Sequence, residues 1–180
     1  MQISCGPRSE VTIMHDRSIR LARPGEAQAI ATLVCGSISE LCLDDHDGDD
    51  SLIERWLANK TKDEIAAWIA AADLSIFVIG CSTGLAAAGC HREDGVILMN
   101  YVSPFYRFQG LSDRMLTHLE SSLAALGITT ARLVSTRTAI GFYQKRGWHT
   151  YGDPIPCRGV SGQPMMKDLT EDRARHETAN

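Results

Sequence analysis

The stretch Asn100-Tyr101-Val102-Ser103-Pro104-Phe105-Tyr106-Arg107-Phe108-Gln109-Gly110-Leu111-Ser112 carries more information than any other part of this chain. An apolar run over 96–102 has the composition of a strand, and Pro104 ends it. After Gly110 apolar residues recur at a helical spacing, at Leu111, Met115, Leu119 and Leu123. The sequence therefore predicts a strand, a tight glycine-containing loop and a helix.

A loop of this kind is suited to a phosphate group. Its backbone N–H groups lie beside a helix N-terminus, so that the donors and the helix dipole point the same way. Arg107 adds a positive charge at the start of the loop. An ordinary strand-to-helix turn with a surface arginine explains the six residues equally well, so a second signal is needed.

The second signal lies in residues 131–148. The run 131–134 predicts a strand, and 138–147 predict a short helix with its stop. Lys145 and Arg146 fall in the last helical turn, where the helix dipole favours cations, and Gly147 suits the left-handed position that follows.

Both segments resemble the GNAT acetyltransferase family. Arg107-x-x-Gly110-x-Ser112 is similar to the family's pyrophosphate loop, Gln/Arg-x-x-Gly-x-Gly/Ala, and departs from it by the serine at the last small position. Ala139-x-x-Phe142-Tyr143-x-x-x-Gly147-Trp148 is similar to the family's Ala-x-x-Phe-Tyr-x-x-x-Gly-Phe signature, and it begins 29 residues after Gly110. The resemblance covers roughly residues 18–169, with both motifs in the order and at the separation that the family requires.

The resemblance implies an α/β (α+β) fold, with a mixed, mostly antiparallel central sheet of about 6–7 strands flanked by about four helices. Strands are expected at 18–23, 75–79, 85–91, 96–102, 131–134, 148–152 and 163–169. Helices are expected at 24–38, 52–57, 61–71, 111–126 and 138–147, with a polar loop at 44–50. We expect residues 18–169 to form a single acetyltransferase domain, 1–17 a flexible N-terminal extension and 170–180 a charged C-terminal tail.

Composition argues against several classes of protein. The chain has 180 residues and 44% hydrophobic content, enough for one domain with a sizeable core. Its net charge of −4 argues against a nucleic-acid partner, because non-specific binding needs a basic surface. No pair among the six cysteines is Cys-x-x-Cys and no Cys/His spacing matches a zinc site, so no metal is expected. Reduced thiols and the lack of a membrane-length apolar run predict a cytoplasmic protein without a membrane partner.

The resemblance implies that acetyl-coenzyme A is the co-substrate. Backbone groups of Tyr101 and Val102 would pair with its pantetheine arm, and an amide there would polarise the thioester carbonyl. Thr136 stands where many members carry asparagine and is a candidate donor to the coenzyme. The candidate pyrophosphate-binding residues are Arg107, Phe108, Gln109, Gly110, Leu111 and Ser112.

Tyr143 is the candidate general acid. A phenol keeps its proton at neutral pH, because its reference pKa is about 10 against about 8.5 for a thiol, so it can protonate a departing thiolate. The alternative is that Phe142 and Tyr143 are simply two helix aromatics. Asn100 is the second candidate catalytic residue, because its amide can anchor a water.

The sequence assigns no general base. Val96 stands where some family members carry a glutamate, and His91 and Glu93 are better explained as solvent-exposed polar residues. A base acting through water, or an amine that arrives already deprotonated, stays open.

Residues 44–50 include five carboxylates. A calcium loop with Gly48 at its sixth place would need a ligand at Leu43, which has none, so calcium is not expected. In the family this segment often borders the acceptor site, and a negative rim would attract a cationic amine. The candidate acceptor residues are Asp44, Asp45, His46 and Trp56. A solvated loop is the alternative for the carboxylates, and core packing is the alternative for Trp56.

The sequence thus predicts an acetyl-coenzyme A-dependent N-acetyltransferase that modifies the primary amine of a small molecule, with a cationic acceptor as one option. The alternatives are a protein or peptide amine acetyltransferase and a non-catalytic acyl-coenzyme A-binding module, which would not need Tyr143. A homodimer is left open.

Overall fold

The structure, a computed structural model, describes residues 18–157 and 159–170. The predicted extension 1–17 and residues 171–180 of the predicted tail lie outside the described residues. In chain order the elements, with η for 3-10 helices, are β1 (Ile19–Leu21), η1 (Pro24–Glu26), α1 (Ala27–Leu41), α2 (Leu43–His46), α3 (Asp50–Leu57), α4 (Lys62–Ala70), β2 (Leu74–Cys81), β3 (Gly84–Arg92), β4 (Ile97–Val102), η2 (Pro104–Tyr106), α5 (Leu111–Ala125), β5 (Thr130–Ser135), η3 (Arg137–Ala139), α6 (Ile140–Gln144), β6 (His149–Thr150), β7 (Ile155–Cys157) and β8 (Val160–Asp168).

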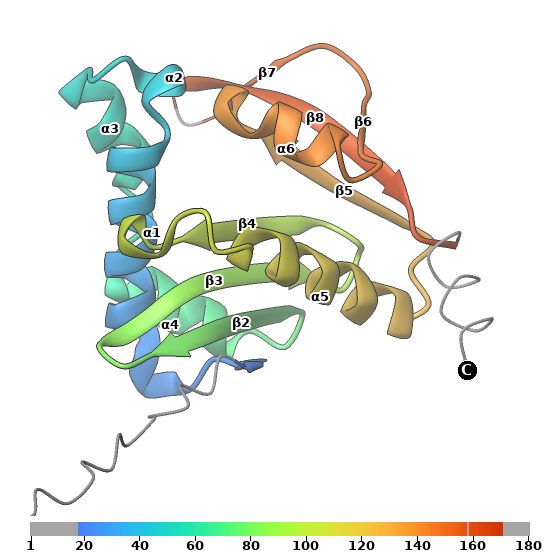
Figure 1. Ribbon diagram of the computed structural model, residues 1–180, viewed down its shortest axis with the longest axis horizontal. Coiled ribbons are helices and arrows are strands. Elements are labelled where there is room, and N and C mark those ends of the chain that lie inside the picture. Colours follow the sequence, from blue (N-terminus) through green and yellow to red (C-terminus); the bar gives the residue numbers. More distant parts are fainter. Residues whose placement is uncertain (1–17, 158, 171–180) are drawn as a thin grey trace, which may run out of the picture.

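The strands form two antiparallel groups. The first has the order β1-β2-β3-β4, and the second has the order β5-β8-β6, with β7 also paired to β8. A single parallel bridge between Val96 and Arg132 joins the two groups, and there the Arg132 N–H donates to the Gly95 carbonyl at 2.9 Å. Figure 1 shows α5 lying along the first group and α6 beside the second. The mixed, mostly antiparallel α/β architecture predicted from the sequence is confirmed.

Both faces of the first sheet are buried: successive residues of a strand point to opposite sides, and here each side belongs to a hydrophobic core. Phe77 and Ile79 of β2 belong to the core on the α5 side, whereas Ile76 and Val78 belong to the core beneath α1 and α4. This double burial fixes β4, the last strand of the sheet, between two helical layers.

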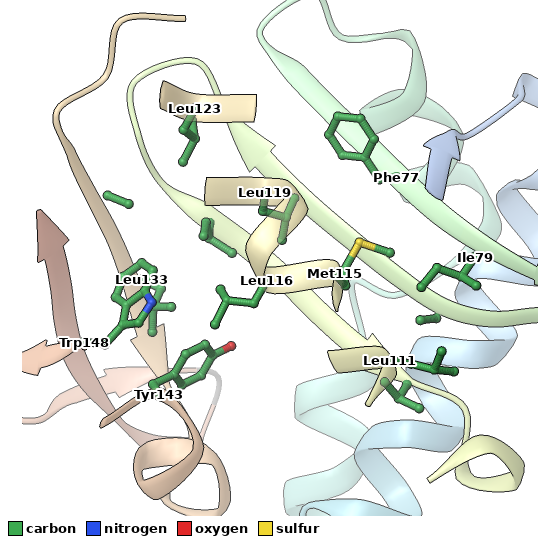
Figure 2. Packing of buried hydrophobic residues seen from close by; sticks show 14 of the residues in the cluster. Phe77, Ile79, Leu111, Met115, Leu116, Leu119, Leu123, Leu133, Tyr143 and Trp148 are labelled. Carbon is green, nitrogen blue, oxygen red and sulfur yellow. The ribbon is translucent and has the colours of Figure 1, made fainter. Parts of the chain in front are cut away.

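Helix α5 is held by the apolar stripe that its sequence predicts. Leu111, Met115, Leu119 and Leu123 are buried, and Figure 2 shows this row facing Phe77 and Ile79. Gly89 of β3 permits the close approach, because a Cβ atom there would lie 2.7 Å from the Met115 Cγ. The N-terminus of α5 is thereby fixed next to the end of β4.

Two local predictions need correction, and one strand is additional. The polar loop at 44–50 is wrong in part, because Leu43–His46 form α2 and α3 already begins at Asp50, where the Asp49 side chain accepts from the amides of Ser51 and Leu52. The strand expected at 148–152 contracts to β6. Strand β7 was not predicted, since it exists only through its pairing with the first residues of β8. Among the described helices, none combines the length and apolar character needed to cross a bilayer.

Candidate active site

The candidate site lies where the two strand groups separate. β4 and β5 run side by side, but beyond the bridge at Val96 and Arg132 no further pairing between them occurs among the described residues. A cavity of about 170 Å³ opens in this gap. It is lined by Ser37, Leu41, Cys42, Ile97, Leu98, Met99, Asn100, Tyr101, Val102, Ser112, Leu133, Val134, Ser135, Thr136, Thr138, Ala139 and Tyr143.

The cavity gathers six of the residues that the sequence singled out. These are Asn100, Tyr101, Val102, Ser112, Thr136 and Tyr143. They come from β4, the first turn of α5, the end of β5 and α6, which explains why two distant motifs were needed to find them. Residues 107–111 of the loop do not line this cavity, and Leu111 is a core residue with 2% of its surface exposed.

The loop before α5 has the geometry of an anion cradle. Gly110 is the residue before the helix and has φ +71°, a left-handed conformation that favours glycine. As the N-cap residue, Gly110 makes no side-chain cap hydrogen bond, and a Cβ atom at Gly110 would meet no atom within 4 Å. Arg107 is exposed, with its guanidinium 4.8 Å from the centre of the Phe108 ring. An uncapped helix N-terminus with a nearby cation fits a phosphate group.

Tyr143 is buried and retains its proton. Burial raises the pKa of Tyr143 to about 12, although the hydrogen-bonding side chain of Asn100 acts in the opposite direction. The ring packs edge-on against Phe142 and Trp148, with ring centres 5.1 and 5.8 Å away. The protonated phenol is thus packed in the wall of the cavity.

Asn100 is the second polar group beside Tyr143. Its Nδ2 donates to the Ser112 carbonyl at 3.2 Å, which links β4 to the first turn of α5. Its Oδ1 is buried and has no hydrogen-bond partner among the described residues. A buried carbonyl oxygen of this kind is available to a donor that enters the cavity.

The described residues that line the cavity include no carboxylate and no histidine. His91 is buried rather than solvent-exposed, which corrects the sequence interpretation, and its Nε2 lies 2.8 Å from the Ser122 hydroxyl beneath α5. Glu93 is exposed, as expected.

The four candidate acceptor residues take different positions, and none lines the cavity. Asp44 is exposed on α2. Asp45 accepts hydrogen bonds from Arg137 and Thr138 at the start of η3. His46 and Trp56 are 1% and 4% exposed and pack together with ring centres 6.5 Å apart, the core packing that was the alternative for Trp56.

Sequence reasoning missed one wall of the cavity. Ser37, Leu41 and Cys42 belong to the end of α1, and burial raises the pKa of the Cys42 thiol to about 12. No local pattern marks these residues, because only packing places the end of α1 opposite β5. Thr138 is another cavity residue that sequence reasoning missed, but it immediately precedes the second motif and could have been found from that position.

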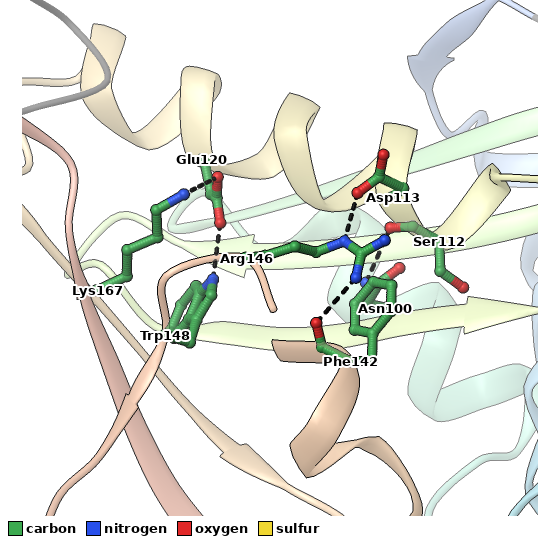
Figure 3. Close-up of polar contacts among 8 residues, drawn as sticks. All are labelled: Asn100, Ser112, Asp113, Glu120, Phe142, Arg146, Trp148 and Lys167. Atoms are coloured by element: carbon green, nitrogen blue, oxygen red, sulfur yellow. Dashed lines mark hydrogen bonds and ion pairs between the residues drawn. The ribbon is translucent and has the colours of Figure 1, made fainter. Parts of the chain in front are cut away.

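Polar side chains also tie α5 to the second sheet (Figure 3). Arg146 pairs with Asp113 in the first turn of α5, donates to the Phe142 carbonyl at 2.9 Å, and stacks over the Phe142 ring at 3.8 Å. This tie holds the C-terminal end of α6 next to the first turn of α5.

A larger cavity, of about 790 Å³, lies along α5 between Asp113 and Gly127 and reaches Lys167 and Leu169. None of the predicted catalytic or coenzyme-binding residues lines it. The smaller cavity, which gathers residues from both motifs, is therefore the candidate site.

Comparison with known proteins identifies the fold and the family. A family model described as the acetyltransferase (GNAT) domain matches residues 43–169. The chain belongs to the GNAT acetyltransferase family. Membership carries with it an acetyl-coenzyme A-dependent N-acetyltransferase activity.

Solved structures share the fold of this GNAT acetyltransferase. A GCN5-related N-acetyltransferase from Rhodopseudomonas palustris is 20% identical with a TM-score of 0.76, and the match covers 84% of this chain and 95% of that one. The PaiA N-acetyltransferase from Thermoplasma acidophilum, solved in complex with coenzyme A, is 17% identical with a TM-score of 0.71 and coverages of 84% and 98%. YncA from Salmonella typhimurium, solved with acetyl-CoA, is 14% identical with a TM-score of 0.64 and coverages of 84% and 93%. No curated protein matches the sequence.

Within residues 18–157 and 159–170, no group of three or more His, Cys, Asp or Glu side chains is placed to hold a metal ion. The homodimer stays a prediction.

Proposed function

We propose that this GNAT acetyltransferase transfers the acetyl group of acetyl-coenzyme A to the primary amine of a small molecule in the cavity between β4 and β5. The observation that carries the proposal is the meeting of Tyr143, Asn100 and the Tyr101–Val102 backbone around one cavity of about 170 Å³. A cavity of this size suits a small acceptor group near the reacting atoms.

The coenzyme would be held at two places. The pyrophosphate would lie on the loop 107–112, where the uncapped N-terminus of α5 and the exposed Arg107 favour an anion. The pantetheine arm would lie in the gap between β4 and β5, where the backbone of Val102 can pair with an extended chain. Tyr101 lies opposite Ala88 in the ladder that the Ser103 N–H to Ala86 bond continues, so its own backbone groups face β3. Thr136, at the end of β5, would donate to the same arm.

Two groups would then support acetyl transfer. A backbone N–H of β4 would stabilise the negative charge that develops on the thioester oxygen as the amine attacks. Tyr143 would give its proton to the sulfur as the carbon–sulfur bond breaks. Burial raises the pKa of Tyr143, and it would also raise the pKa of a coenzyme thiol in the same cavity. The pKa difference that opposes proton transfer from the phenol to the sulfur is therefore smaller than the raised pKa of Tyr143 alone suggests.

The amine would enter in its neutral form or lose its proton to water. The described cavity lining offers no side chain with the pKa of a general base. Asn100 Oδ1, buried and without a partner in the described part of the chain, is the atom that would accept a hydrogen bond from the amine or from a bridging water.

The proposal is tested with a panel of amines and detection of the released thiol. The panel contains polyamines, amino acids, aminoglycosides and short peptides at equal concentration. Turnover with one small-molecule class supports the proposal. Turnover with peptides alone would replace it by a protein or peptide acetyltransferase, and coenzyme binding without turnover on any amine would favour a binding module.

A further inference from the structure

One carboxylate of the acidic segment contacts a part of the chain that lies 92 residues further on. Asp45 Oδ1 accepts from the backbone N–H of Arg137 at 2.6 Å. Asp45 Oδ2 accepts from the backbone N–H of Thr138 at 3.2 Å and from its hydroxyl at 2.6 Å. Both oxygens are therefore used at the start of η3, which continues directly into α6.

These contacts supply a cap that the local sequence does not. The first N–H groups of a helical segment have no partner within the helix. Thr136 stands at the capping position of η3 but makes no side-chain hydrogen bond there. The carboxylate of Asp45 fills this role from another element, and its negative charge is favourable at a helix N-terminus.

Asp45 is itself held in place by its neighbour His46. The Gly48 N–H donates to His46 Nδ1 at 3.1 Å, so this nitrogen carries a lone pair and the ring proton of the neutral form resides on Nε2. Nε2 donates to the Ile38 carbonyl at 3.1 Å. Because His46 is 1% exposed and bonded to Ile38, α2 is fixed against the end of α1, and Asp45 is fixed with it.

The contact joins the two sides of the candidate cavity. Leu41 and Cys42, which precede α2, form one wall, whereas Thr138, Ala139 and Tyr143 of the η3–α6 segment form the other. The strands themselves are bridged only near Val96, at the opposite end of β5. Asp45 therefore ties the walls together at the end where the strands have separated.

We propose that Asp45 is a positioning residue for acetyl transfer. By capping η3 it sets the place of the α6 segment, and with it the Tyr143 hydroxyl, relative to β4. This inference rests on the proposed role of Tyr143 as general acid. Asp45 contacts no substrate, so its removal lowers the rate of the chemical step and leaves coenzyme binding at the loop 107–112 intact.

The test is a set of variants with kcat, KM and coenzyme affinity measured for each. Asp45→Ala removes the cap, Asp45→Asn keeps one acceptor oxygen, and Thr138→Val removes only the hydroxyl contact. We expect kcat to fall by about 10- to 100-fold in Asp45→Ala, because small misplacements of reacting groups have effects of this size. We expect smaller losses of kcat in the other two. Because Thr136 adjoins the repositioned segment, coenzyme Kd is measured as well, and in all three variants the fall in kcat should exceed any rise in coenzyme Kd.

Thr61→Ala is the matched control. The Thr61 hydroxyl caps α4 by accepting from the Glu64 N–H at 3.2 Å, away from the cavity, so its loss removes a helix cap without touching the site. Its kcat should equal that of the wild type. Should Asp45→Ala fail to fold, Asp45→Asn and Thr138→Val still decide the question.

A double variant, Asp45→Ala with Tyr143→Phe, separates this inference from the proposed function. If Asp45 acts through Tyr143, its removal costs little in the Tyr143→Phe background. An equal loss in both backgrounds, a wild-type kcat in Asp45→Ala, or a rise in acceptor KM alone that salt abolishes would overturn the inference. If Tyr143→Phe alone leaves turnover unchanged, the general-acid assignment fails instead.

Discussion

The indole N–H of Trp148 donates from Nε1 to Oε1 of the Glu120 carboxylate at 2.7 Å, which joins α5 to the residue that precedes β6. The other oxygen of Glu120 pairs with Lys167 Nζ of β8 at 2.8 Å. The Glu120 and Lys167 side chains are only 10% and 13% exposed, so both contacts are shielded from water (Figure 3). Three elements thus share one buried carboxylate.

Replacing Lys167 by Met should destabilise the protein by about 3 kcal/mol, because it leaves the Glu120 charge buried without its cation. The midpoint of urea unfolding measures this. Arg92→Met is the control, because the Arg92–Asp94 pair is 40% and 53% exposed and such pairs contribute within about 0.5 kcal/mol. Adding Glu120→Gln to Lys167→Met should recover part of the loss, and a loss no greater than that of the control would contradict the prediction.

Tyr143→Phe should lower kcat by about 10²–10⁴-fold while the Kd of acetyl-coenzyme A stays near the wild-type value, since a proton donor is lost and little volume changes. Thiol release under saturating substrate gives kcat, and calorimetry gives Kd. Tyr151→Phe, at a residue 41% exposed, is the matched control and should be silent. Unchanged turnover, under conditions where chemistry limits the rate, would leave Tyr143 with a packing role only.

Gly110→Glu should abolish binding of acetyl-coenzyme A, because it places a negative charge at the N-terminus of α5. Gly127→Glu is the control: both glycines have positive φ, +71° and +83°, and open space at the Cβ position, so backbone strain is matched. Calorimetry with acetyl-coenzyme A and with acetyl-pantetheine measures the effect. In the wild type the full coenzyme should bind far more tightly than the fragment that lacks the pyrophosphate, and equal affinities would refute the assignment of the loop.

Stability should fall in mild acid because of two histidines, the buried His91 and the half-buried His118. Burial lowers the pKa of His91 and of His118, so both are neutral in the folded protein near neutral pH. In the unfolded chain both histidines become protonated near pH 6.5, their ordinary pKa. Between about pH 6.5 and the lowered pKa values of the folded state, the unfolded chain therefore binds more protons than the folded protein. Over that window the free energy of unfolding decreases as pH falls.

Urea midpoints measured across this pH range test the prediction. His91→Asn and His118→Asn should each flatten the pH dependence, whatever they do to absolute stability, while His149→Asn, at an exposed position, should preserve it. If the urea midpoint changes with pH by the same amount in the wild type and in all three variants, the acid sensitivity belongs to other groups.

The exposed carboxylates of the acidic segment should matter only for a cationic acceptor. Asp44, Asp47 and Asp50 are exposed, whereas Asp45 and Asp49 make capping contacts. Replacing the three exposed residues by Asn therefore removes charge and leaves the capping contacts in place. Acceptor KM should rise, and the rise should shrink with salt, because exposed charges are screened over about 8 Å at physiological ionic strength. Coenzyme KM should not rise. An acceptor KM unaffected at every salt concentration would indicate a loop that is merely solvated.

The sequence by itself determined most of the elements and the glycine turn before α5, because these depend on residues close together in the chain. The row from Leu111 to Leu123 sets one face of α5, Thr61 begins α4 by capping it, and Gly110 and Gly147 adopt the positive φ that their positions need. Each of these effects acts within one or two helical turns, so periodicity and capping chemistry are sufficient to predict them.

Only the tertiary structure decided what surrounds Tyr143 and where His91 lies. The end of α1 forms a wall of the cavity, Asp45 caps a segment 92 residues away, and His91 is buried beneath α5 instead of exposed. None of these has a local signal, because each arises when two elements pack and a polar group without a partner in its own segment finds one in the other. The separation of β4 and β5 beyond the Val96–Arg132 bridge, where the candidate site lies, is likewise visible only in the tertiary structure.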